Sequence, residues 1–241
     1  MLTLYQFPIS HYCEKIRWAL DYKQLDYRAI NLLPGLHTRQ ARKLVGSTSL
    51  PILLHDGKAI QNSSDILDYL DQQFPDSPLA PEEAGLRGQV LAWEKFADEE
   101  IGVPVRMACY HVLLDYPEVV IPLFTDNGPW YGPLMMKIIF PKLRQKMRAM
   151  MKINERTVRI AHKRLEKAVD KVWVRLQNRE FLVGDHFSRA DLATAALLAP
   201  LCWPQKYGLN WPRNFPERLE TIAAPYREKL AWVDGLYDQY R

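Results

Sequence analysis

Two different hydrophobic patterns divide the chain, and the first covers residues 1–76. Runs rich in β-formers and bounded by turn residues occur at 2–7, 26–32, 51–54 and 58–60. Apolar residues at helical spacing occupy 11–24 and 63–74, and a loop with one short helix fits 33–47. The strand–helix–strand order predicts a parallel pair with a right-handed crossover. The Asp56-Gly57 turn then adds an antiparallel hairpin, so we expect a mixed four-stranded sheet.

The second pattern begins after a proline-rich segment at 75–85, which holds three prolines in eleven residues and indicates a linker. From about residue 84 to the end the spacing is helical, with interruptions at 126–133, 183–187 and 203–216. The sequence therefore predicts an α/β domain over 1–76 and an all-helical domain over 85–241.

Charge is spread unevenly along the chain. The net charge of +4 is small, yet residues 79–133 sum to −6 and residues 134–180 to +10. A basic block of this kind attracts nucleic acid or an anionic membrane. Alternatively, it forms a long helix pair with solvated Lys and Arg faces, partly packed against the acidic block before it. We favour the helix pair and expect no nucleic-acid partner.

Cysteine usage and hydropathy bear on the compartment. The three cysteines, Cys13, Cys109 and Cys202, are too few and too far apart for a disulfide scaffold or a metal site. The N-terminus lacks the pattern of a signal peptide, and the apolar stretch at 131–141 is too short to span a bilayer. We expect a cytoplasmic protein with no metal and no membrane span.

Four segments at the joints of these elements hold the candidate chemistry. They are "LYQFPISHYCEKIRWAL", "SLPILL", "IQNSSDILDYL" and "FLVGDHFSRADLATAALL". Ser10 precedes a helix, and Pro51 at the start of a strand prevents the chain from pairing with itself there. Ser63 fits an N-cap, whose hydroxyl and N–H groups suit a carboxylate. The Ser188–Asp191 pair matches a capping box, which points to a structural role at a buried helix start.

Taken together and in order, the four segments resemble the cytosolic glutathione transferase superfamily over nearly the whole chain. The resemblance implies a thioredoxin-like N-terminal domain that binds glutathione and a helical domain that holds a small hydrophobic electrophile. It also implies a role in detoxification and a homodimer. Within the superfamily the chain is similar to Ser-type members, with Ser10 as the hydrogen-bond donor that stabilises the glutathione thiolate.

The same resemblance implies further contacts to glutathione. Leu50, before a cis Pro51, exchanges main-chain hydrogen bonds with the cysteinyl part, and Ser63 holds the γ-glutamyl carboxylate. Asn62 stands where the family often has Glu or Gln. His37 falls near a position that faces the glycine carboxylate, and Ser49 is a weaker candidate.

Several alternatives stay open. Cys13 could act as the thiol of a glutathione-dependent thiol transferase or reductase, although position 10 lacks the cysteine that such members carry. Tyr5 lies one residue away from the catalytic tyrosine position of Tyr-type members. The chain could also be a non-catalytic interaction module of the same fold. For the electrophile site the candidates are Tyr12, Met107 and Tyr110.

Overall fold

The computed structural model describes all 241 residues, and the first domain is built on one sheet. Its strands are β1 (Leu2–Gln6), β2 (Tyr27–Asn31), β3 (Ile52–His55) and β4 (Lys58–Gln61). They lie in the order β2-β1-β3-β4, with β1 parallel to β2 and β3 antiparallel to both of its neighbours. The predicted mixed four-stranded sheet, with a parallel pair and a hairpin, is confirmed.

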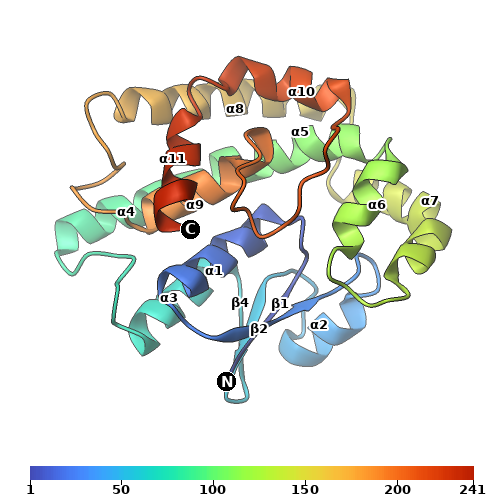
Figure 1. Ribbon diagram of the computed structural model, residues 1–241, viewed down its shortest axis with the longest axis horizontal. Helices are drawn as coiled ribbons and strands as arrows, with labels where there is room; N and C mark the ends of the chain where they lie inside the picture. The colour runs from blue at the N-terminus through green and yellow to red at the C-terminus, as the bar shows by residue number, and fades with distance from the viewer.

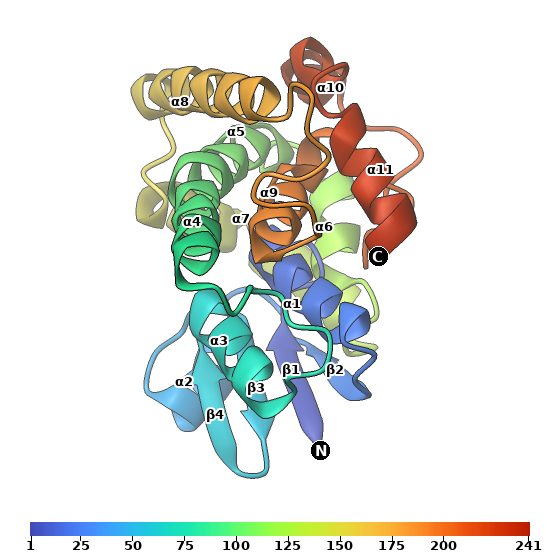
Figure 2. The same cartoon turned by 90° about the vertical axis from the view of Figure 1, so that its left-hand side faces the viewer.

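Three helices belong to this domain: α1 (His11–Tyr22), α2 (Thr38–Val45) and α3 (Ser63–Gln73). α1 buries nine of its twelve residues, because one face covers the sheet and another meets the helical domain. α1 packs beside α3 and against α9 (Arg189–Leu198). In Figure 2, α1 and α3 accordingly lie between the sheet below and the helical domain above.

The second domain is helical throughout (Figures 1 and 2). Apart from α9 it contains α4 (Ala84–Phe96), a π-helical segment η1 (Ala97–Gly102), α5 (Val103–Leu113), α6 (Pro117–Thr125), α7 (Gly132–Met150), α8 (Glu155–Arg175), the 3-10 turns η2 (Ala199–Leu201) and η3 (Ala224–Tyr226), α10 (Glu217–Ala223) and α11 (Ala231–Tyr240). All ten residues of α9 are buried, so this Ala- and Leu-rich helix forms the centre of the domain.

The start of α9 has the predicted capping box. One oxygen of Asp191 accepts hydrogen bonds from the Ser188 N–H at 3.0 Å and the Ser188 hydroxyl at 2.9 Å. The other oxygen accepts from the Leu182 N–H at 2.8 Å, which ties the preceding loop to the helix. Burial raises the pKa of Asp191 to about 6, against the opposing effect of these three donors. The pair is therefore structural, as the sequence indicated.

The basic block forms helices whose arginines pair with the acidic segment before it. Arg148 on α7 contacts Asp115 at 2.8 Å, and Arg164 on α8 contacts Glu100 at 2.8 Å. This partial packing of basic against acidic residues agrees with the favoured interpretation of the charge pattern. None of the helices combines the length and the apolar character needed to cross a membrane.

Candidate functional site

Strand register brings three separate segments to one end of the sheet. Tyr5 on β1 pairs with Ile52 on β3, and Ile52 pairs with Gln61 on β4. Continuing each pairing along the antiparallel strands places Leu50-Pro51 between the end of β1 and the start of α3. The Phe7–Ser10 turn, the Leu50-Pro51 bond and the α3 N-terminus therefore meet there.

Ser10 is the N-cap of α1. Its main-chain conformation is extended, its N–H donates to the Phe7 carbonyl at 3.1 Å, and its Oγ accepts from the Cys13 N–H at 3.4 Å. The proton of the hydroxyl has no acceptor within the protein. Ser10 therefore offers a partly buried O–H donor beside the positive end of a helix.

Leu50 and Pro51 are joined by a cis peptide bond, as the resemblance implied. The main-chain N–H and C=O of Leu50 have no hydrogen-bond partner in the protein. Next to it, the Gln61 side chain donates to the Ser49 carbonyl at 2.6 Å and to the Ser49 hydroxyl at 2.8 Å. Gln61 thus fixes the segment before the cis bond, a role that sequence reasoning missed because the two residues are twelve positions apart.

The α3 N-terminus differs from the sequence expectation by one residue. Asn62, not Ser63, is the N-cap: its side-chain oxygen accepts from the Ser64 N–H at 3.3 Å. Asn62 adopts φ 77°, a left-handed conformation that Asn tolerates better than most residues. Ser63 is then the first helical residue and is buried, at the same end of the sheet as Ser10.

His37 lies against the first segment, with its ring 4.7 Å from the Phe7 ring in an edge-on arrangement. Its Nδ1 accepts from the Gly35 N–H at 3.1 Å, so the ring proton resides on Nε2, which donates to the Thr48 carbonyl at 3.0 Å. Burial lowers the pKa of His37 and favours this neutral form. Both ring nitrogens form hydrogen bonds with main-chain groups, so His37 stabilises the 35–48 loop.

Cys13 points into the core. It is fully buried, and burial raises the pKa of its thiol despite the nearby Ser10 hydroxyl and Arg17 charge. A thiol acts as a nucleophile only when ionised. Its environment matches that of a small apolar core residue.

His11 and Tyr12 reach from α1 into the π-helical segment. The Tyr12 hydroxyl donates to the Asp98 carbonyl at 2.6 Å, and His11 Nε2 donates to the Gly102 carbonyl at 3.0 Å. A methyl group at Gly102 would lie 2.4 Å from the Tyr12 hydroxyl oxygen, so the close approach requires glycine. His11 is buried, whereas a residue in the first turn of a helix ordinarily lies on the surface. Tyr12 links the two domains through the hydrogen bond that its hydroxyl donates to Asp98.

Met107 and Tyr110 are three positions apart on α5, so their side chains leave the helix at neighbouring positions. Met107 lines a cavity of about 180 Å³ with Val103 on α5 and Ile160 on α8. The Tyr110 ring lies 6.1 Å from the ring of Phe124 on α6, and burial raises the pKa of its hydroxyl.

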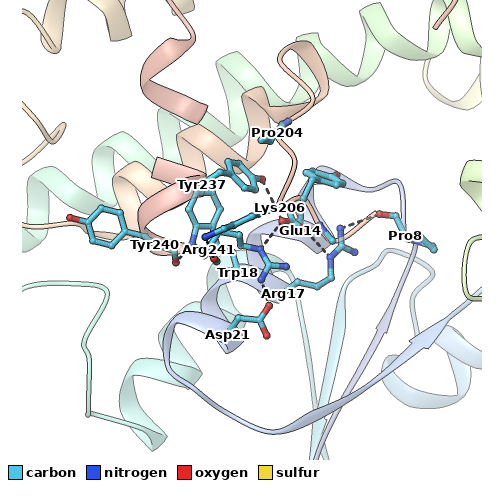
Figure 3. Close-up of polar contacts among 12 residues, drawn as sticks. Pro8, Glu14, Arg17, Trp18, Asp21, Pro204, Lys206, Tyr237, Tyr240 and Arg241 are labelled. Carbon is cyan, nitrogen blue, oxygen red and sulfur yellow. Dashed lines mark hydrogen bonds and ion pairs between the residues drawn. The ribbon is translucent and has the colours of Figure 1, made fainter. Parts of the chain in front are cut away.

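A buried ionic cluster links α1 to the C-terminal segment of the chain (Figure 3). The Glu14 carboxylate is fully buried and contacts Arg17 Nε at 2.6 Å and Arg241 Nε at 3.0 Å. It also accepts from the Gly208 N–H at 3.2 Å and from the Tyr237 hydroxyl at 3.4 Å. α1 is thereby fastened to the 204–241 segment, a contact that no pattern in the sequence predicts.

The same cluster holds the turn before Ser10. Arg17 Nη2 donates to the Pro8 carbonyl at 3.1 Å, and the Tyr207 hydroxyl donates to the Ile9 carbonyl at 3.3 Å. Arg17 Nη1 also donates to the Gln6 side chain at 2.6 Å. Two carbonyls immediately before Ser10 are therefore fixed by side chains from α1 and from the C-terminal segment.

A second ionic cluster crosses the domain boundary near α3. Lys15 contacts Glu94 at 2.7 Å and Asp98 at 2.9 Å, and the Ser64 hydroxyl donates to Asp98 at 3.1 Å. Arg189 contacts Glu94 at 2.6 Å and the Ser64 carbonyl at 3.2 Å. These contacts fix the first turn of α3 relative to the helical domain.

Comparison with known proteins agrees with this architecture. The family model "Glutathione S-transferase, N-terminal domain" matches residues 4–78, and "Glutathione S-transferase, C-terminal domain" matches residues 131–218. Together they cover more than half of the chain. The chain belongs to the glutathione S-transferase family, with one N-terminal and one C-terminal domain of that family.

Curated relatives are glutathione S-transferases. Glutathione S-transferase 1 of Dianthus caryophyllus is 36% identical over 85 residues, 34% of this chain and 38% of the relative. Glutathione S-transferase U2 of Arabidopsis thaliana is 30% identical over 101 residues, 42% of this chain and 45% of the relative. The matched part thus spans less than half the length of each of these relatives.

Solved structures share the fold over almost the full chain. Beta-etherase LigF from Sphingobium sp. strain SYK-6 superposes with a TM-score of 0.66 at 19% identity, covering 99% of both chains. A glutathione S-transferase from Methylobacillus flagellatus, solved with GSH bound, gives a TM-score of 0.58 at 20% identity, covering 98% of both chains. At these identities the likeness shows the fold: a thioredoxin-like domain followed by a helical domain. No group of three or more His, Cys, Asp or Glu side chains is arranged to hold a metal ion.

Proposed function

We propose that the chain is a glutathione transferase that joins the glutathione thiolate to a small apolar electrophile, with Ser10 stabilising the thiolate. The observation that carries the proposal is the free hydroxyl proton of Ser10 at the α1 N-terminus, at the same sheet end as the unpaired main chain of Leu50. A cytoplasmic homodimer, which the family resemblance implies, is part of the proposal.

The chemistry needs an ionised thiol at neutral pH. A free cysteine thiol has a pKa of about 8.5, so only a few per cent is thiolate at pH 7. A hydroxyl donor and the positive end of a helix both favour the anion, and Ser10 combines the two. Serine supplies the hydrogen bond and does not remove the proton. The thiolate then forms a bond to the electrophilic carbon, and the leaving group departs with its electron pair.

Binding follows from the same geometry. An extended tripeptide beside Leu50 pairs with its free N–H and C=O as an added strand does. The γ-glutamyl carboxylate then reaches Ser63 at the α3 N-terminus, where N–H groups and the helix dipole favour an anion. Asn62 is exposed and Ser49 and His37 already bond within the protein, so their contacts to glutathione are secondary in this proposal.

The electrophile belongs on the side of Ser10 that faces α5. Tyr110, a partly buried aromatic residue on α5, is the favoured contact in this proposal. Tyr12 lines the electrophile site with its ring, and its hydroxyl stays bonded to Asp98. Met107 lies on the α8 side and is a weaker candidate.

Two substitutions test the proposal. Ser10→Ala removes the donor and should lower kcat for conjugation of an aryl halide by about 100-fold, the usual effect of deleting one such donor. Retention on immobilised glutathione should change little, because the main-chain contacts remain. Cys13→Ser is the matched control and should keep most of the activity.

Each alternative has its own outcome. Unchanged turnover in Ser10→Ala would refute the role of Ser10. A thiol transferase requires Cys13→Ser to abolish reduction of a glutathione mixed disulfide, which the burial and raised pKa of Cys13 disfavour. A non-catalytic interaction module would show no conjugation by the unmodified protein and no retention on glutathione.

A further inference from the structure

The outward side of α7 exposes large apolar residues that the fold does not use. Trp130, just before the helix, is 92% exposed, and Leu134 and Ile138 are each 68% exposed. The spacing of four places Leu134 and Ile138 along one side of the helix, and Trp130 lies in the turn that leads into it. The opposite side already packs into the core through Met136, Phe140 and Leu143. α7 is therefore stably held while its apolar outer side has no partner.

Lysines flank this apolar row. α7 carries five basic residues and no acidic residue. Arg144 and Arg148 both face Asp115, at 3.8 Å and 2.8 Å. The remaining three, Lys137, Lys142 and Lys146, are exposed and form no ion pair. We call Trp130, Leu134, Lys137, Ile138, Lys142 and Lys146 together the α7 face. Figure 1 shows that α7 lies at the right-hand periphery of the molecule.

We propose that the α7 face docks on an anionic lipid surface. A helix with an apolar strip, a tryptophan at its end and lysines along its flanks lies in the plane of a bilayer interface. The apolar residues enter the boundary between headgroups and acyl chains, and the lysines approach acidic headgroups. The proposal concerns attachment at the surface, and it is independent of the activity at Ser10.

Charge disfavours a second copy of this chain as the occupant. A two-fold dimer contact brings the same patch of both subunits together. Lys137, Lys142 and Lys146 would then face the same lysines of the partner, with no carboxylate on the α7 face to offset them. An acidic lipid surface offers the opposite charge over the whole area.

The test is co-sedimentation of the full chain with vesicles. Vesicles of phosphatidylcholine with about one third phosphatidylserine should bind the protein, and vesicles of phosphatidylcholine alone should bind it far less. Raising the salt concentration should weaken binding, because salt screens the lysines. Binding to neither kind of vesicle, or equal binding to both, would overturn the proposal.

Surface variants sharpen the test without disturbing the core. The triple variant Lys137→Gln, Lys142→Gln, Lys146→Gln should lower affinity for acidic vesicles by about 100-fold, since each lysine near such a surface contributes roughly a factor of five. Leu134→Ser with Ile138→Ser should abolish binding.

The matched control is Arg156→Gln, Lys163→Gln, Lys167→Gln on the exposed side of α8, which should bind like the unmodified protein. A loss as large in this control would mean that total charge, and not the α7 face, governs binding. Sedimentation velocity completes the test: a dimer that Leu134→Ser with Ile138→Ser dissociates would assign the face to a second copy and overturn the proposal.

Discussion

Replacing Glu14 by Gln should destabilise the protein strongly, although the two side chains have nearly the same shape. The substitution keeps one acceptor oxygen for the Gly208 N–H but removes the negative charge between Arg17 and Arg241. Arg241 retains Asp21 as an ion-pair partner, whereas Arg17 has no other carboxylate. The loss therefore falls mainly on one buried cation.

The magnitude follows from that uncompensated charge. Removing one member of a buried ion pair costs about 3–5 kcal/mol. Because Arg17 keeps its bonds to Gln6 and the Pro8 carbonyl, we expect the lower end, about 3 kcal/mol of the free energy of unfolding. For a chain of this size that corresponds to a fall in Tm of about 6–12 °C.

Chemical denaturation of Glu14→Gln and of a control, Glu228→Gln, measures the effect. Glu228 is exposed and forms no ion pair, so its substitution should change the free energy of unfolding by less than about 0.5 kcal/mol. The double variant Glu14→Gln with Arg17→Met removes both charges and should recover part of the loss. A cost below about 1 kcal/mol for Glu14→Gln, or strict additivity in the double variant, would refute the reasoning.

Three further predictions concern the surroundings of Ser10 and the core. Tyr207→Phe removes the hydrogen bond to the Ile9 carbonyl and should lower kcat for conjugation several-fold more than it lowers affinity for glutathione; an unchanged kcat would show that this bond does not position Ser10. Burial, aided by the Arg106 charge, lowers the pKa of His11 to about 3, below its unfolded value of 6.5, so its contribution to stability is complete above pH 6.5 and is lost as pH falls toward 3. Titrating the free energy of unfolding should show this acid loss, about 5 kcal/mol in all, and His11→Gln should show a smaller one. Asp191→Asn turns an amide donor toward N–H donors and should cost about 1–3 kcal/mol in denaturation experiments, whereas turnover per folded molecule should not change.

The local signals in the sequence predicted the fold well. The Asp56-Gly57 turn, the helical spacing after Pro8 and the Ser188–Asp191 capping box each act within a few residues, and the structure has all three as expected. The helix start at Ser63 was predicted within one residue. Asn62 is the N-cap instead. Its main chain has a left-handed conformation, and from there its side-chain oxygen accepts a hydrogen bond from the Ser64 N–H.

The support behind the candidate site could not be predicted, because its contacts join distant residues. Glu14 meets Arg241 across 227 positions, and His11 meets Gly102 across 91. Neither pairing has a periodicity or motif that marks it, and a buried Glu or His in a helix resembles a solvated one in sequence. The roles of Ser10, Leu50 and Ser63 came from the resemblance, and they stay predictions until the variants are measured.

The π-helical segment at Ala97–Gly102 joins α4 and α5 into one continuous rod. It also changes the direction in which the side chains of α5 point relative to those of α4. A wider turn takes up about one additional residue, and one residue corresponds to about 100° of rotation in the α-helix that follows. The side chains after Gly102 are therefore turned relative to those before Ala97, while the axis carries on. By this shift in phase, the half that presents Glu94 to Lys15 and Arg189 continues into a half that presents Met107 to α8. One rod thus packs against α9 at one end and against α8 at the other.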